Sequence, residues 1–212
     1  VINADADLTP YTLVIAPMLY MVRDGFAERV ERHLHKGGQF VASYWTGVVN
    51  ETDLCHLGGF PGPLRPLLGI WAEEIDSLTD EESNGIQGIK GNALGLSGPY
   101  QARELCELIH LEGATALARY QSDFYAGQPA VTVNEVGAGK AWYIASRNDL
   151  TFHRDFYGAL IKQLALPRAL DVTLPPGVTA HPRTDGEQSF IFLQNYTAAE
   201  HRVKLPAGFS YL

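Results

Sequence analysis

Cysteine is scarce in this sequence, which limits the chemistry that it can perform. The 212 residues include two cysteines, Cys55 and Cys106, and neither belongs to a CxxC motif. Two cysteines cannot form the dense disulfide framework of a small secreted domain. A catalytic thiol would also need a nearby base and an exposed strand-to-helix turn, and no Gly-x-Cys-x-Gly sequence surrounds either residue. We therefore expect two free thiols, as in a cytoplasmic protein.

Long apolar runs and basic clusters are missing as well. No apolar run approaches the roughly 20 residues that a membrane-spanning helix requires. Acidic residues outnumber basic ones by 24 to 16, and the net charge is −8. This balance argues against nucleic acid and anionic membranes as partners. The first residues lack the basic start and apolar core of a signal peptide, and they lack Met. We expect a cytoplasmic localisation and a fragment of a longer protein.

Recognisable catalytic and metal-binding motifs are also absent. The sequence has no phosphate-binding glycine motif, no HExxH spacing and no nucleophile elbow. His33 and His35 are two residues apart on an expected helix, so they face different directions and make a poor metal pair. The acidic residues between 73 and 82 could include a glycosidic acid/base pair, but a solvated segment is the simpler interpretation. We predict no cofactor and no bound metal.

The first part of the chain has the pattern of a βαβ unit. Residues 11–16 and 40–45 are apolar runs typical of buried parallel strands. A helix is expected between them, capped by Asp24 and ended by Gly37 and Gly38. This order predicts two parallel strands joined by a right-handed crossover.

The following part is richer in antiparallel signals. We expect a short helix at 63–68, a mixed segment at 71–78, a short strand at 86–89, and strands at 105–111 and 114–120 joined by a turn at Glu112 and Gly113. Residues 130–134 and 141–145 flank Gly137 and Gly139 and predict a hairpin. Asp149 begins a final helix with an apolar stripe spaced by four residues.

From about residue 169 the pattern changes to short strands separated by turns. Residues 178–182, 189–194 and 201–205 have the strand pattern. Three short strands are too few for an independent sheet. We therefore expect an incomplete antiparallel β domain.

The stretch from residue 40 to residue 76 is the most distinctive part of the chain. A strand pattern breaks there into a loop at 47–68 that is rich in glycine and proline and is flanked by aromatic residues. Loops at strand ends commonly carry functional residues in α/β folds. This loop has no catalytic motif of its own, so we expect it to serve a neighbouring part of an assembly.

Several ordered motifs resemble a known family. Residues 44–53 (YWTGVVNETD), 58–64 (GGFPGPL) and 68–76 (LGIWAEEID) are similar to the trimerisation domain of the β-galactosidases of glycoside hydrolase family 42. Residues 91–98, 123–134 and 137–147 fit the same pattern. The resemblance covers nearly the whole chain.

The resemblance implies a fold, a domain division and a role. It implies a three-layer α/β/α, Rossmann-like domain of the class I glutamine amidotransferase type at 1–168, and a partial C-terminal β domain at 169–212. Family members carry two catalytic glutamates in a (β/α)8 barrel, so the resemblance implies no catalytic residue in this chain. The implied partners are two further copies in a homotrimer, the barrel of the full-length enzyme and, through that enzyme alone, terminal β-D-galactosides.

The candidate interface or substrate-site residues are those of the central stretch: Tyr44, Trp45, Asn50, Glu51, Phe60 and Trp71. Exposed aromatic side chains can anchor a subunit interface or stack on a sugar. We expect the loop to reach the neighbouring subunit and to brace its barrel. Two alternatives remain open at this point: a thiol hydrolase using Cys55 or Cys106, and a carbohydrate-binding module built on the aromatic residues.

Overall fold

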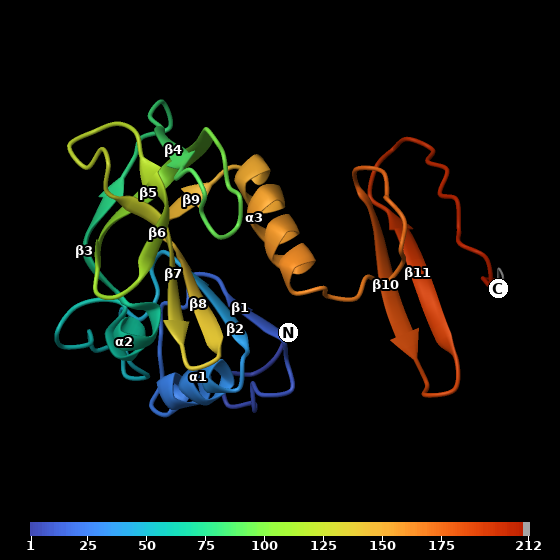
Figure 1. Ribbon diagram of the computed structural model, residues 1–212, viewed down its shortest axis with the longest axis horizontal. Coiled ribbons are helices and arrows are strands. Elements are labelled where there is room, and N and C mark those ends of the chain that lie inside the picture. The colour runs from blue at the N-terminus through green and yellow to red at the C-terminus, as the bar shows by residue number, and fades with distance from the viewer. Residues whose placement is uncertain (210–212) are drawn as a thin grey trace. The chain divides into compact units, whose positions relative to one another are not determined.

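The computed structural model describes residues 1–209 and separates the chain into two compact units, Val1–Leu164 and Ala165–Leu212 (Figure 1). The first unit is a mixed α/β structure in which most of the regular elements are strands. The second unit contains one two-stranded sheet. Among residues 1–209, no helix combines the length and the apolar character needed to cross a bilayer.

One nine-stranded sheet organises the first unit, with the order β1-β2-β8-β7-β6-β4-β5-β3, and β9 pairs with β5. Its strands are β1 (Leu13–Ala16), β2 (Gln39–Ser43), β3 (Ile70–Ser77), β4 (Asn84–Gly88), β5 (Tyr100–Leu111), β6 (Thr115–Tyr120), β7 (Pro129–Val136), β8 (Gly139–Ile144) and β9 (Ser146–Asn148). β1 with β2 and β2 with β8 are parallel pairs, and the other pairs are antiparallel.

Two apolar cores form on opposite faces of this sheet. Phe40 and Ala42 of β2 join one buried cluster, and Val41 between them joins the other, as the alternation of side chains along a strand requires. Helices α1 (Phe26–His35) and α2 (Arg65–Leu68) contribute buried residues to the first cluster, and the 3-10 helix η1 (Gly62–Leu64) adds one more. Helix α3 (Leu150–Gln163) contributes Phe152, Phe156 and Leu160 to the second.

Several sequence predictions are confirmed. β1, α1 and β2 form the expected βαβ unit with parallel strands. β7 and β8 form the expected antiparallel hairpin, and Gly137 occupies the left-handed region with φ of 60°. The carboxylate of Asp149 caps α3 by accepting a 2.8 Å hydrogen bond from the backbone N–H of Phe152.

Two local predictions are wrong. Asp24 does not cap α1, because the N-cap is Gly25 in a left-handed conformation and no side chain bonds there. Residues 71–78 are not a mixed segment, since β3 runs through them as an edge strand. The strands predicted at 105–111 and 114–120 are confirmed as parts of β5 and β6, with the turn at Glu112 and Gly113 between them in the chain. The two strands are not neighbours in the sheet, because β4 lies between them.

The second unit is an antiparallel hairpin of β10 (Val178–Thr184) and β11 (Ser189–Asn195). The predicted strand at 201–205 is not formed: within residues 1–209 that segment has no ladder partner. A strand needs such a partner to satisfy its backbone groups, so the sequence pattern alone could not secure it.

Candidate functional site

The candidate site lies where the parallel strands β1 and β2 end. The segment after β1 and residues 44–61 after β2, which we call the β2 loop, run side by side from this edge of the sheet. The N–H of Gly47 donates to the carbonyl of Leu19, and the N–H of Val48 donates to the carbonyl of Tyr20, both at 2.9 Å. These bonds join two loops that are separate in the sequence, so the two loops form one continuous surface at the ends of β1 and β2.

Large apolar side chains are exposed on this surface. They are Met18 and Tyr20 after β1 and Trp45, Leu54 and Leu57 in the β2 loop, and Leu57 is fully exposed. Tyr20 and Trp45 meet edge to face, with ring centroids 6.5 Å apart. Exposed apolar groups gathered in one place commonly mark an interaction surface, because isolated monomers rarely leave them uncovered.

A buried carboxylate fixes the start of the β2 loop. Glu107 on β5 is 1% exposed, and its Oε1 accepts a 2.7 Å hydrogen bond from the backbone N–H of Trp45. Its Oε2 accepts a 2.6 Å bond from the hydroxyl of Tyr143 on β8. Trp45 has a φ of 57°, in the left-handed region that residues other than glycine seldom adopt. The carboxylate therefore holds a strained residue in place.

Burial sets the protonation of Glu107. Desolvation raises its pKa to about 7, against the opposing effect of the hydrogen bonds from Tyr143 and Trp45. The side chain therefore changes charge near neutral pH. Sequence analysis did not single out this residue, although a lone glutamate inside the apolar run of residues 105–109 was the available signal.

Asn50 and Glu51 occupy a turn within the β2 loop. The Oδ1 atom of Asn50 accepts bonds from the backbone N–H of Thr52 at 2.9 Å and of Leu54 at 3.1 Å. Such a side chain replaces backbone partners and fixes the turn. Glu51 is exposed on the same turn. Asn50 thus shapes the loop, and Glu51 faces the solvent.

The far end of the β2 loop returns to the sheet at Phe60. The N–H of Ala72 on β3 donates to the carbonyl of Phe60 at 3.0 Å, and the ring of Phe60 packs against the core on the α1 side. Gly59 allows a close approach, because an added Cβ would lie 2.7 Å from Nε1 of Trp71. Phe60 is therefore an anchor of the loop as well as a candidate contact residue.

Trp71 belongs to a row of interacting side chains across the sheet edge. Its ring stacks on His110, with centroids 4.9 Å apart, and the guanidinium of Arg65 lies 5.5 Å from its centroid. Arg65 also makes two hydrogen bonds to Glu112, at 2.6 and 2.5 Å, and one to the carbonyl of Gly58 at 2.5 Å. This row ties the β2 loop to β3 and β5.

The Arg65→Ala substitution should loosen the β2 loop, because it removes the bond to the Gly58 carbonyl and the paired contact with Glu112. We expect limited proteolysis to cut residues 44–61 several-fold faster in this variant, since cleavage follows local opening. Arg103→Ala, at an exposed position of β5, is the control and should leave the rate unchanged. Equal cleavage rates in both variants would contradict this role for Arg65.

Four of the six candidate residues lie at two places, and Asn50 and Glu51 lie on the turn between them. Tyr44 and Trp45 follow β2 directly, whereas Phe60 and Trp71 lie at β3. The two places are joined where Gly47 passes Pro61, since an added Cβ on Gly47 would lie 2.1 Å from the Pro61 carbonyl oxygen. The β2 loop is thus closed at this neck.

The cysteines do not form a nucleophilic site. Both are free; Cys55 is exposed and Cys106 is buried. Burial raises the pKa of the Cys106 thiol to about 11, which is the opposite of activation. Among residues 1–209, no hydrogen bond is formed by the Cys55 sulfur, and no cluster of three or more His, Cys, Asp and Glu side chains could hold a metal ion.

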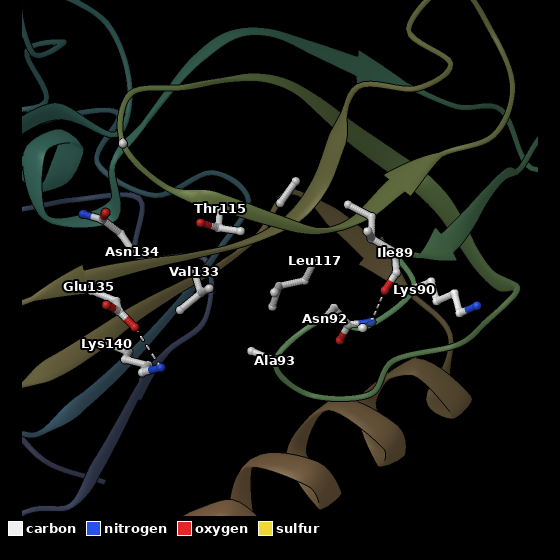
Figure 2. A pocket seen from close by; sticks show the side chains of 13 residues that line it. Ile89, Lys90, Asn92, Ala93, Thr115, Leu117, Val133, Asn134, Glu135 and Lys140 are labelled. Carbon is white, nitrogen blue, oxygen red and sulfur yellow. Dashed lines mark hydrogen bonds and ion pairs between the residues drawn. The ribbon is translucent and has the colours of Figure 1, made fainter.

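One hollow of the first unit is separate from the β2 loop. It has a volume of about 540 Å³ and is lined by residues from the 89–93 segment and from β6, β7 and β8 (Figure 2). Several of its polar groups already have partners: Lys140 pairs with Glu135 at 3.1 Å, and Asn92 bonds the carbonyls of Ile89 and Leu96. Lys90 points away from the hollow in Figure 2. The lining offers no convergent binding groups.

Comparison with known proteins identifies the family. Residues 1–167 match the family model described as β-galactosidase trimerisation domain, and residues 177–212 match the β-galactosidase C-terminal domain. The chain belongs to the β-galactosidase trimerisation domain family. The resemblance seen in the sequence motifs is thereby confirmed.

Individual relatives agree with this assignment. The chain is 50% identical over 205 residues to β-galactosidase Pbg of Clostridium perfringens and 48% identical to β-galactosidase BglY of Alicyclobacillus acidocaldarius, covering 97% of this chain in each case. A crystal structure of a β-galactosidase from Rahnella sp. R3 is 68% identical and superposes with a TM-score of 0.90 over 93% of this chain and 29% of that one. The chain spans about 30% of the length of the curated relatives. No comparison supports a thiol hydrolase or a carbohydrate-binding module.

Proposed function

We propose that this chain is the non-catalytic oligomerisation part of a homotrimeric, cytoplasmic β-galactosidase. The observation that carries the proposal is the match of residues 1–167 to a trimerisation domain. In the parent enzyme, the catalytic groups for hydrolysis of terminal β-D-galactosides belong to a barrel, and this chain alone does not turn over substrate. We further propose domain limits at 1–168 and 169–212, and a three-layer, class I glutamine amidotransferase-like class for the first domain.

The β2 loop is our candidate for the contact with a neighbouring subunit. Trp45, Tyr20 and the exposed leucines of this loop offer apolar area that a partner could cover. Trimers with cyclic symmetry join two different patches on each copy, so this edge would meet another surface of the next subunit. Tyr44, Trp45, Asn50, Glu51, Phe60 and Trp71 are the residues that we assign to this contact and to the bracing of the neighbouring barrel.

The solution mass of the chain tests the proposal. Light scattering after gel filtration should give a mass near three times the chain mass of 23.2 kDa. The Trp45→Ala and Leu57→Ala variants should shift the population towards monomer, because truncated apolar anchors cost interface energy of about 1–4 kcal/mol each. Phe124→Ala, at an exposed position after β6, is the matched control and should keep the wild-type mass. Masses unchanged in the two loop variants would remove the β2 loop from the interface.

A further inference from the structure

We propose that Glu107 is the positioning residue for Trp45, and that ionisation of its buried carboxyl tightens the entrance of the β2 loop. The inference rests on the proposed function in one respect, that Trp45 belongs to the subunit-contact surface. Glu107 does not itself reach that surface, since it is 1% exposed. It acts through the backbone bond to Trp45.

The geometry around Glu107 joins several strands to the loop entrance. Glu107 accepts from Trp45 with one oxygen and from Tyr143 with the other. The backbone N–H of Glu107 donates to the carbonyl of Ala145 at 2.7 Å. The backbone of Trp45 at the loop entrance is thus held by a single carboxylate, which is itself fixed by Tyr143.

Protonation changes the strength of this hold. A carboxylate accepts from both donors with charge assistance, which makes each bond shorter and stronger than a neutral one. A protonated carboxyl carries a hydrogen on one oxygen, and that oxygen becomes a donor. It is then a poorer acceptor for the Trp45 N–H or the Tyr143 O–H, whichever it faces. Because Trp45 has a left-handed backbone, a weaker bond leaves it freer to relax.

The groups that surround Glu107 stay neutral while it titrates. They are Tyr143 on β8, Tyr120 on β6, Tyr44 after β2 and the preceding Cys106. The charged guanidinium of Arg147 on β9 acts on Tyr44 and is not one of these neutral groups. Burial raises the pKa of each of the three tyrosines and of the Cys106 thiol. Among residues 1–209, none of the ion pairs includes Glu107. The change of charge is therefore confined to one side chain.

Nuclear magnetic resonance of the 212-residue chain tests the inference directly. The amide proton of Trp45 should move downfield as the pH rises, with a midpoint near 7, because its acceptor becomes a carboxylate. The indole N–H of Trp142 is the internal control, since it donates to the neutral Oε1 of Gln39 at 3.0 Å and should not follow this titration. Glu107→Gln keeps an acceptor of the same size and should give a flat Trp45 profile.

A second measurement separates this inference from the proposed function. The trimer of the wild-type chain should dissociate at several-fold higher concentration below the midpoint than above it, and this difference should vanish in Glu107→Gln. A wild-type Trp45 amide that does not titrate would overturn the positioning role, whether or not the chain forms trimers. A titrating Trp45 in a chain that is monomeric at every pH would support the positioning role and overturn the proposed contact. The wild-type titration decides even if the variant fails to fold.

Discussion

Gly47→Ala should lower the free energy of unfolding by about 3 kcal/mol, whereas Gly58→Ala should lower it by about 1 kcal/mol. Both glycines have positive φ, at 67° and 94°, so an alanine at either position carries the cost of the left-handed region. The two positions differ in their surroundings. A Cβ at Gly58 meets nothing within 4 Å, whereas a Cβ at Gly47 would lie 2.1 Å from the carbonyl oxygen of Pro61.

The Pro61 backbone cannot move away cheaply from such a Cβ. Its carbonyl accepts the N–H of Leu64 within the short helix η1, and Leu64 is fully buried. An overlap with fixed backbone therefore displaces the β2 loop or the helix, which adds about 1–3 kcal/mol to the conformational cost. We expect the Gly47 variant also to lose assembly, since the neck holds both ends of the loop.

Urea denaturation of the two variants, followed by circular dichroism, measures this difference. The midpoint for Gly47→Ala should fall well below that for Gly58→Ala, at similar slopes. If the two variants lose the same stability, the backbone strain alone accounts for both, and the close approach of Pro61 has no energetic weight.

Local patterns in the sequence predicted the elements whose determinants are local. The helix that begins after Asp149 has its cap and its apolar stripe within one segment, and the β7–β8 hairpin has its turn residues beside its strands. The family resemblance was carried by motifs such as residues 44–53 and 58–64, and the comparisons confirm it. The signal in each case lies within about a dozen neighbouring residues.

The remaining features depend on contacts between distant segments. β4 pairs with both β5 and β6, so Ile86 lies between Tyr100 and Tyr120, which no local turn signal could indicate. The edge strand β3 carries Glu73 and Glu74, whose charges hid the strand pattern; charged residues are common on edge strands because they discourage aggregation.

The sequence indicated which segment holds the candidate site, but it did not indicate which side chains are in contact there. Tyr44, Trp45, Phe60 and Trp71 were chosen for their type and their place beside a loop. The bond between Trp45 and Glu107 joins residues that are 62 positions apart in the sequence. The bond between Arg65, which lies against Trp71, and Glu112 joins residues that are 47 positions apart. Burial of Glu107, which controls its chemistry, exists only after the sheet has assembled.

Glu107→Gln should remove a pH dependence of stability amounting to about 3 kcal/mol. Burial raises the folded-state pKa of Glu107 from its ordinary value of 4.5 to about 7. Between these two pH values the folded protein keeps a proton that the unfolded chain has released, so the stability that this proton gives is fully present below the lower pKa. That stability is lost as the pH rises through the folded-state pKa. Above that pKa, Glu107 no longer makes the free energy of unfolding depend on pH.

Chemical denaturation at a series of pH values, with wild type and variant measured in parallel, checks this result. Exposed carboxyl groups with lowered pKa, such as Glu82, Glu112 and Asp185, lose stabilising interactions at acid pH, but both proteins share them and they cancel in the difference. The variant should therefore gain stability relative to wild type as the pH rises from about 5 to about 8. Tyr143→Phe supplies the matched test, because losing its hydroxyl bond raises the Glu107 pKa further and should extend the falling limb to higher pH. A difference between wild type and Glu107→Gln that does not vary with pH would show that Glu107 is ionised throughout, held by its two donors despite its burial.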